Sequence, residues 1–196
     1  FAPSRLGTNR LGFDRHYVVF KLHWDRSDVG ARLHRGAGPC QARILETTID
    51  ARLIAIDALT GRPCRDFGRD GEVSLLDGLG QVPKGYYFIN GGPTIARGKI
   101  VVGAAVADNQ KWGEPSGVIR AFDVTTGQLS WAYDVGAPNR IGARPPGETY
   151  TRSTPNSWAQ MAYDDKLGLV YVPTGNATPD HYGRQRRPID DEISSA

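Results

Sequence analysis

Two cysteines are the residues of this chain whose spacing most directly suggests chemistry. Cys40 and Cys64 lie on either side of a strand-like apolar segment at residues 52–56. This arrangement fits a disulfide between neighbouring strands in an oxidising compartment, and two isolated thiols are the alternative. The four histidines have no spacing typical of zinc ligands, and the sequence contains no Cys-x-x-Cys pair. The cysteines therefore predict a structural bond or free thiols, and no zinc centre.

The basic residues are the second candidates for a chemical role. Their densest cluster, Arg-Gln-Arg-Arg at residues 184–187, is followed closely by acidic residues at 190–192. A solvated loop explains this pattern best, and an anion-contacting site is the alternative. Across the chain 24 basic and 21 acidic residues are interspersed, which leaves a net charge of +3. So small an excess, without an RNA or DNA motif, does not indicate a nucleic-acid partner.

An internal repeat organises the elements that must position these residues. Residues 51–61 and residues 117–127 each form a short apolar run that ends in Asp-x-x-Thr-Gly. The Asp and Thr side chains can hydrogen-bond the turn backbone, and Gly can take the positive φ of a hairpin bulge. Each copy therefore predicts a strand, a tight turn and a second strand.

The repeat and the many turn residues predict an all-β fold. Strands are expected at residues 43–48, 52–56, 100–107, 158–163 and 167–172, residues 68–92 are expected to be loop-like, and a further strand is expected to begin at residues 191–196. Strand repeats of this period indicate propeller blades or a β-solenoid. We expect a partial β-propeller of two to three four-stranded antiparallel blades, because a closed propeller needs more.

The chain divides at about residue 37. Residues 1–37 have no clean alternation and are assigned no function, whereas residues 38–196 carry the propeller pattern. The longest apolar run, at residues 100–107, is far shorter than the roughly 20 residues that span a bilayer. The N-terminus has no signal-peptide pattern.

Three segments together resemble the quinoprotein dehydrogenases, above all the membrane-bound, pyrroloquinoline quinone (PQQ)-dependent glucose/quinate/shikimate dehydrogenase group. They are the repeated strand with Asp-x-x-Thr-Gly, the stretch Val-Gly-Ala-Ala-Val-Ala-Asp-Asn at residues 102–109, and the stretches Pro-Asn-Ser-Trp and Pro-Thr-Gly-Asn-Ala-Thr-Pro-Asp at residues 155–158 and 173–180. The resemblance covers about residues 38–196. It implies part of an eight-bladed propeller that faces the periplasm and passes electrons to ubiquinone, in a protein anchored by membrane helices that this chain lacks.

The resemblance also implies a cofactor site. Asp108 and Asn176 match metal ligands for Ca²⁺ or Mg²⁺, Trp158 matches the ring that stacks on PQQ, and Asn109 and Thr178 are weaker candidates for cofactor contacts. By residue type alone, Asp108 and Asn176 would be ordinary turn residues and Trp158 a core residue. We expect Asp108, Trp158 and Asn176 to converge at one end of the blades.

The implied reaction is the oxidation of a polyol, a sugar such as glucose, or a cyclic hydroxy acid such as quinate or shikimate. An Asp general base takes the hydroxyl proton while hydride passes to the quinone. That Asp, and a cofactor-binding Lys or Arg, are expected beyond Ala196, so this chain alone should be inactive. The stretch before Cys40 lacks the upstream cofactor motif. The arginines at residues 186–187 slightly favour a carboxylated substrate. The alternative function is a non-catalytic propeller scaffold that binds a protein partner.

Overall fold

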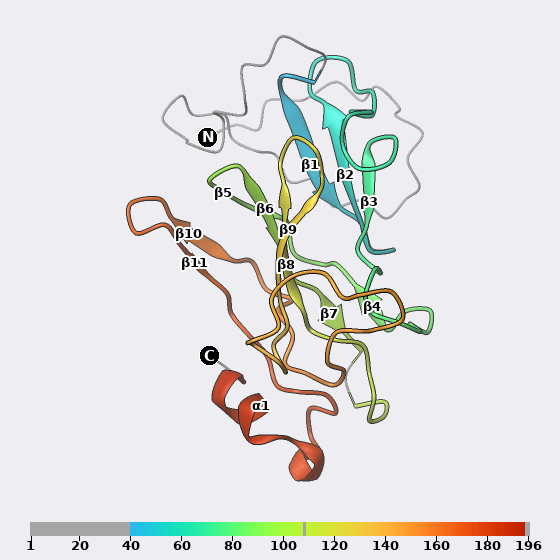
Figure 1. The fold of residues 1–196 in the computed structure, drawn as a ribbon, viewed down its shortest axis with the longest axis vertical. Coiled ribbons are helices and arrows are strands. Elements are labelled where there is room, and N and C mark those ends of the chain that lie inside the picture. The colour runs from blue at the N-terminus through green and yellow to red at the C-terminus, as the bar shows by residue number, and fades with distance from the viewer. Residues whose placement is uncertain (1–39, 108, 195–196) are drawn as a thin grey trace, which may run out of the picture.

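The computed structural model describes residues 40–107 and 109–194, which form mostly antiparallel strands with little helix. Figure 1 shows the elements in chain order: β1 (Arg43–Thr47), β2 (Arg52–Asp57), β3 (Glu72–Ser74), β4 (Tyr87–Phe88), β5 (Thr94–Ala96), β6 (Lys99–Val102), β7 (Ala105–Val106), β8 (Ile119–Asp123), β9 (Leu129–Tyr133), β10 (Ala162–Asp164), β11 (Leu169–Tyr171), the short 3₁₀-helix η2 (Gly183–Gln185) and α1 (Pro188–Ile193).

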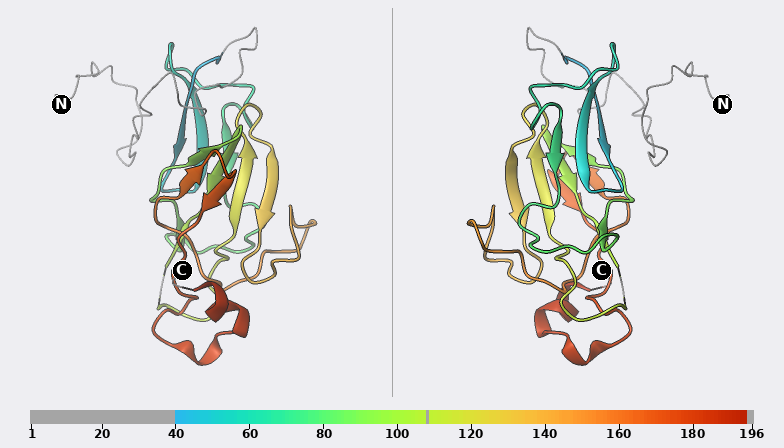
Figure 2. Two further views of the ribbon diagram at one scale, coloured as in Figure 1. Left: turned by 90° about the vertical axis from the view of Figure 1, so that its left-hand side faces the viewer. Right: turned by 90° about the vertical axis from the view of Figure 1, so that its right-hand side faces the viewer.

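These strands form two main sheets and two strand pairs. The first sheet has the order β1-β2-β3, and the second sheet has the order β5-β6-β8-β9. The pairs are β4 with β7 and the hairpin β10–β11, and every pairing between these strands is antiparallel. The second sheet lies between the first sheet and the hairpin, as Figures 1 and 2 show together. This stacking of sheets confirms the expected all-β class and its four-stranded unit.

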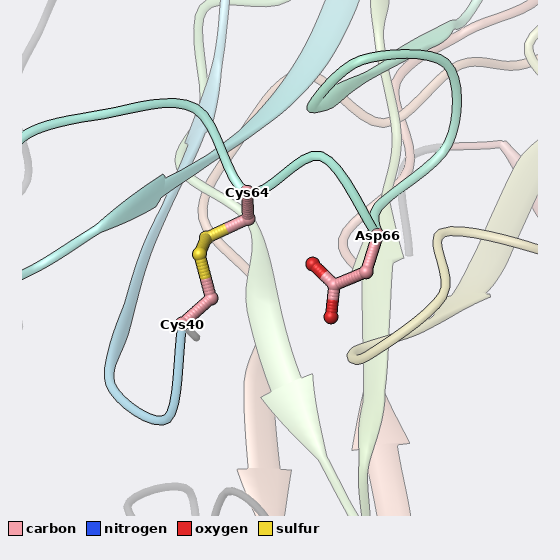
Figure 3. Close-up of side chains that lie close together, drawn as sticks. All are labelled: Cys40, Cys64 and Asp66. Atoms are coloured by element: carbon pink, nitrogen blue, oxygen red, sulfur yellow. A yellow bond between two sulfur atoms is a disulfide. The ribbon is translucent and has the colours of Figure 1, made fainter. Parts of the chain in front are cut away.

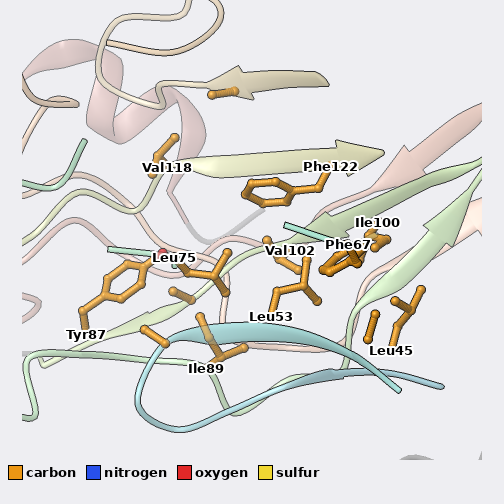
Figure 4. Packing of buried hydrophobic residues seen from close by; sticks show 14 of the residues in the cluster. Leu45, Leu53, Phe67, Leu75, Tyr87, Ile89, Ile100, Val102, Val118 and Phe122 are labelled. Atoms are coloured by element: carbon orange, nitrogen blue, oxygen red, sulfur yellow. The ribbon is translucent and has the colours of Figure 1, made fainter. Parts of the chain in front are cut away.

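The second sheet is buried on both faces because its apolar residues alternate between two cores. Ile100 and Val102 of β6 and Phe122 of β8 pack into the first core, together with Leu53 and Phe67 (Figure 4). Val101, Ile119 and Ala121 point to the opposite face and pack into the second core, which the hairpin covers. Side chains that alternate along a strand make this two-sided burial possible. Continuous apolar runs such as residues 100–102 are its signature in the sequence.

The two Asp-x-x-Thr-Gly turns have the same hydrogen bonds, as the repeat predicts. In the first, Asp57 Oδ1 accepts hydrogen bonds from the amides of residues 59 and 60 at 2.9 and 2.8 Å. In the second, Asp123 Oδ1 accepts them from residues 125 and 126 at 3.0 and 2.9 Å. The closing glycines Gly61 and Gly127 have φ values of 69° and 70°. Their amides donate to the carbonyl oxygens of Asp57 and Asp123.

A disulfide joins Cys40 and Cys64, with the two Cα atoms 5.7 Å apart (Figure 3). This confirms the predicted bond and excludes the alternative of two isolated thiols. Asp66 lies beside the sulfur atoms, and its carboxylate accepts a hydrogen bond from Arg43. Because the sulfurs are bonded to each other, this cluster is a structural crosslink beside an ion pair.

Two expectations for the middle of the chain were wrong in detail. The expected strand at residues 100–107 is divided at Gly103, so that β6 pairs in the second sheet and β7 pairs with β4. A Cβ on Gly103 would lie 2.4 Å from the Ser157 carbonyl oxygen, so at this break the chain passes too close to its neighbour for any side chain. Residues 68–92 contain the short strands β3 and β4, although they were expected to be loop-like.

The end of the described chain also differs from expectation. Residues 191–193 of the strand expected at 191–196 belong to helix α1 instead, because Pro188 occupies the first turn and the Asp190 carboxylate accepts a hydrogen bond from the Arg187 amide at 2.9 Å. Residues 195–196 lie outside the described residues. The last hairpin is shorter than predicted, since β10 begins at Ala162 and β11 ends at Tyr171. Trp158 therefore lies in a loop before β10.

Candidate functional site

The loop that carries Trp158 is held in place by glycines on neighbouring segments. A Cβ on Gly117 would lie 1.9 Å from the Pro155 carbonyl oxygen, and a Cβ on Gly103 would lie 2.4 Å from that of Ser157. Only glycine allows the backbones to approach this far. The loop at residues 155–158 is therefore packed directly on the chain before β8 and after β6, and the position of Trp158 is determined by this packing.

The Trp158 ring lies beside Gly175, the residue before Asn176. A Cβ on Gly175 would lie 3.3 Å from Trp158 Nε1, and the Gly175 amide donates a hydrogen bond to the Asn156 carbonyl oxygen at 2.9 Å. The Trp158 residue remains 53% exposed. An indole that is fixed at one edge and still open to solvent can stack against a planar ligand. Asn176 follows in the chain and is half-buried.

Asn109 connects the loop after β7 to the loop after β11. Its side-chain Oδ1 accepts a hydrogen bond from the His181 amide at 2.8 Å, and its own φ is 57°. Asn109 is exposed. The structure therefore brings Asn109 to His181, in the segment after β11 that also contains Asn176 and Thr178. Asp108, the other expected metal ligand, lies outside the described residues.

Several buried oxygen atoms in the two segments that carry Trp158 and Asn176 have no hydrogen-bond partner. They are Asn156 Oδ1, Ser157 Oγ and Thr178 Oγ1, on residues that are each 3% exposed or less. An unpaired buried oxygen costs free energy, so atoms of this kind commonly serve a ligand, an ion or a bound water. Sequence reasoning gave Thr178 only a minor role and assigned none to Asn156 or Ser157. Their signal is a polar pair directly before an aromatic residue in a loop.

The arginine cluster is tied to its own loop. Arg187 donates to the buried Asp190 carboxylate from Nε at 2.8 Å and from Nη2 at 2.7 Å. Arg186 donates to the Asp180 carbonyl oxygen and lies 3.9 Å from the Asp191 carboxylate. Arg184 and Gln185 are exposed, as a solvated loop predicts, whereas Arg186 and Arg187 are half-buried and are engaged by groups of the same segment. This also weakens the idea that they recognise a substrate carboxylate.

The donor set suits a flat, polar cofactor held with a hard cation. The exposed indole offers a stacking surface, and the unpaired oxygens offer the ligand type that Ca²⁺ and Mg²⁺ prefer. No helix among the described residues has the length and apolar character needed to cross a membrane. The stacking surface and the oxygen donors thus have the chemical character that PQQ and a divalent cation require.

Comparison with known proteins agrees with this arrangement. Residues 22–196 match the family described as "PQQ: Glucose/ethanol/alcohol dehydrogenase, beta-propeller domain". The chain is 47% identical over 158 residues to the glycerol dehydrogenase large subunit of Gluconobacter oxydans, a match that covers 81% of this chain and 21% of that protein. It is 44% identical to the quinate/shikimate dehydrogenase (quinone) of Acinetobacter baylyi, with 80% and 20% covered.

Further similarities extend the range of substrates named among relatives. The quinoprotein glucose dehydrogenase of Escherichia coli is 41% identical over 157 residues, which cover 80% of this chain and 20% of that protein. The crystal structure of the quinohemoprotein alcohol dehydrogenase from Comamonas testosteroni matches with a TM-score of 0.50 and 24% identity, over 71% of this chain and 21% of that one; it supports the fold alone. The chain spans about a fifth of the length of the curated relatives it matches.

Proposed function

Because this chain belongs to the β-propeller family of PQQ-dependent glucose, ethanol and alcohol dehydrogenases, we propose that it forms part of a quinoprotein dehydrogenase that oxidises a small polyhydroxylated substrate. The observation that carries the proposal is the exposed Trp158 ring beside Gly175, in a loop whose Asn156 and Ser157 have unpaired buried oxygens. A scaffold that only binds a protein partner has no need to leave such oxygens without partners.

In this proposal each residue has a distinct task. Trp158 supports the PQQ ring by stacking, and Asn176 with Asp108 supplies oxygen ligands to Ca²⁺ or Mg²⁺. Asn109 and Thr178 contact the cofactor, and we add Asn156 and Ser157 as further polar groups lining its pocket. When bound, PQQ supplies a quinone that accepts two electrons. The general base that takes the substrate proton is an Asp of a later blade.

The substrate class is best described as a polyol. Relatives are named for glycerol, quinate or shikimate, and glucose, all of which carry several hydroxyl groups. The carboxylate of quinate would need a free cationic group. Arg187 is engaged by Asp190, and Arg186 by the Asp180 carbonyl oxygen and Asp191, so glycerol-like polyols and sugars fit the described residues better. Transfer of electrons to ubiquinone and a position on the periplasmic face of a membrane complete the proposal.

PQQ reconstitution of the full-length protein tests this function. PQQ is titrated in the presence of Ca²⁺ or Mg²⁺, and binding is followed by absorbance, with polyol oxidation as a second readout. We expect Trp158→Ala to weaken PQQ binding roughly tenfold because the stacking surface is lost. Trp158→Phe should retain part of the affinity.

The control is Leu59→Ala, which removes an exposed apolar side chain from the first Asp-x-x-Thr-Gly turn and should leave PQQ binding unchanged. If Trp158→Ala binds PQQ as the parent does, the stacking role is wrong. If the parent protein itself takes up no PQQ with either cation, the dehydrogenase proposal fails and the scaffold becomes the better interpretation.

A further inference from the structure

A cleft of about 620 Å³ lies between the first and second sheets, away from the Trp158 site. The edge strand β3 and the loop after it form one wall, and β8 and β9 form the other. A third side comes from the loop at residues 143–150. Two arginines, Arg120 of β8 and Arg144 of this loop, are among its lining residues.

Arg120 is a buried cation without a carboxylate partner. It is 2% exposed, and its guanidinium donates to the carbonyl oxygens of Leu75 and Asp77 and to Tyr87 Oη. No carboxylate among residues 40–107 and 109–194 lies within ion-pair distance of it, and Nε has no hydrogen-bond partner. Because a guanidinium stays protonated in proteins, the charge remains.

Arg144 brings a second buried guanidinium to the same cleft. Its side chain is 3% exposed and forms an ion pair with the Asp134 carboxylate, itself 1% exposed, at 2.7 Å. The guanidinium carbon lies 4.8 Å from the centre of the Tyr150 ring. Nε of Arg144 also has no hydrogen-bond partner. Burial raises the pKa of the Tyr150 hydroxyl. The positive charges of Arg120 and Arg144 oppose that rise, which indicates that both guanidiniums lie near Tyr150.

The buried charges at the cleft do not balance. The guanidiniums of Arg120 and Arg144 carry two buried positive charges, and the Asp134 carboxylate supplies one buried negative charge. The other acidic groups that line the cleft, Glu72 and Asp77, are exposed, and Glu72 already pairs with Arg52 at 2.9 Å. A buried charge without a partner is costly, and an anion in the cleft would offset that cost.

We propose that this cleft is an anion-binding site that holds a small oxyanion, a phosphate or a carboxylate, between Arg120 and Arg144. Oxyanion groups match the fork of N–H donors that guanidinium presents, and charge-assisted hydrogen bonds of this kind are short and strong. Both Nε–H groups lack a hydrogen-bond partner but are shielded from solvent. The charge of the two guanidiniums that line the cleft is therefore what would hold the anion.

Equilibrium dialysis of the purified full-length protein with labelled inorganic phosphate, at constant ionic strength set with chloride, tests the proposal. We expect one saturable site at the cleft. Arg120→Gln and Arg144→Gln should each weaken phosphate binding at least tenfold, because each removes a charged donor. Acetate should compete with phosphate if carboxylates are ligands, and should fail to compete if the site selects phosphate.

The matched control is Arg65→Gln, which neutralises an exposed arginine outside the cleft and should leave phosphate binding unchanged. Should Arg120→Gln fail to fold, Arg144→Gln and the charge-retaining Arg144→Lys provide the same test, with Lys weaker than the parent and tighter than Gln. Saturable binding that is equal in the parent and both Arg144 variants would overturn the proposal. Absence of saturable phosphate binding in the parent would also overturn it.

Discussion

The two Asp-x-x-Thr-Gly turns are alike internally and differ in what surrounds them. The first turn projects into solvent, where Leu59 is 87% exposed. The second turn rests on the first sheet: Arg43 Nη1 donates to the Thr125 carbonyl oxygen at 2.6 Å, and the Gly68 amide donates to the Thr126 carbonyl oxygen at 2.8 Å. The same local sequence therefore forms an exposed turn in the first copy and, in the second copy, a turn that holds the two sheets together.

The aspartates of the two turns differ in the same way. Asp123 also pairs with Lys99 at 3.1 Å, whereas Asp57 accepts a hydrogen bond from the Cys40 amide at 3.0 Å. Local hydrogen bonds determine the shape of each turn, because they are present in both copies. Contacts with the rest of the molecule determine how much each turn contributes to stability.

Replacing the closing glycines should give the largest difference in stability between the two turns. Alanine at either position must adopt a positive φ, but a Cβ on Gly127 would also lie 2.8 Å from Val73 Cγ2 and 2.9 Å from the Gly68 amide nitrogen. We expect Gly127→Ala to lower the free energy of unfolding by roughly 3 kcal/mol and Gly61→Ala by roughly 1 kcal/mol. Urea unfolding of the full-length protein measures both. Equal losses would mean that the docking of the second turn adds nothing.

Removal of the arginine that holds the joint should have the next largest effect. Arg43 is 8% exposed and donates to the carbonyl oxygens of Cys40 and Thr125 and to the Asp66 carboxylate. We expect Arg43→Ala to cost roughly 2 kcal/mol, because buried acceptors lose a charged donor. The control Arg52→Ala breaks exposed ion pairs with Asp50 and Glu72, and should cost at most about 0.5 kcal/mol.

The smallest expected effect concerns acid sensitivity. Burial alone would raise the pKa of Asp123, but hydrogen bonds from Thr126, Lys99 and Thr125 outweigh it and lower the pKa to about 2. A lowered pKa stabilises the fold above the unfolded value of about 3.8, and this stabilisation is lost as the pH falls from about 4 to 2.

Because solvent screens this partly exposed group, we expect Asp123 to contribute about 1 kcal/mol. Urea midpoints between pH 5 and pH 2 should therefore fall more steeply for the parent than for Asp123→Asn. Parallel curves for the two proteins would show that Asp123 does not titrate with unfolding.

The sequence predicted those parts of the fold that depend on local chemistry. Asp57 and Asp123 determine their turns through hydrogen bonds to residues two and three positions ahead, so their geometry could be expected without a structure. The division of residues 100–107 at Gly103 could not, because it reflects the pairing of β6 and β7 with different strands, which is a tertiary contact. Likewise, α1 depends on the Arg187–Asp190 contacts, which a charge pattern alone does not reveal.

In the candidate site, too, some residues could be predicted from the sequence and others depend on packing. The resemblance identified Trp158 and Asn176, and the structure places the Trp158 ring beside Gly175, next to Asn176 in the chain. Asn156 and Ser157 were missed because their interest lies in unpaired oxygens, which are a property of packing and invisible in residue type. The cofactor roles of all these residues stay predictions until PQQ binding is measured.

The central position of β6 has a consequence for motion. Both of its edges are paired, to β5 and β8, and Ile100 and Val101, on opposite faces, are 0% and 1% exposed. Its amide groups can be exposed only if the second sheet comes apart, which would also disrupt the cores on its two faces. Amide hydrogen exchange along β6, and along its equally paired neighbour β8, should therefore be slow and follow global opening of the stacked sheets, whereas the edge strand β3 exchanges through fraying.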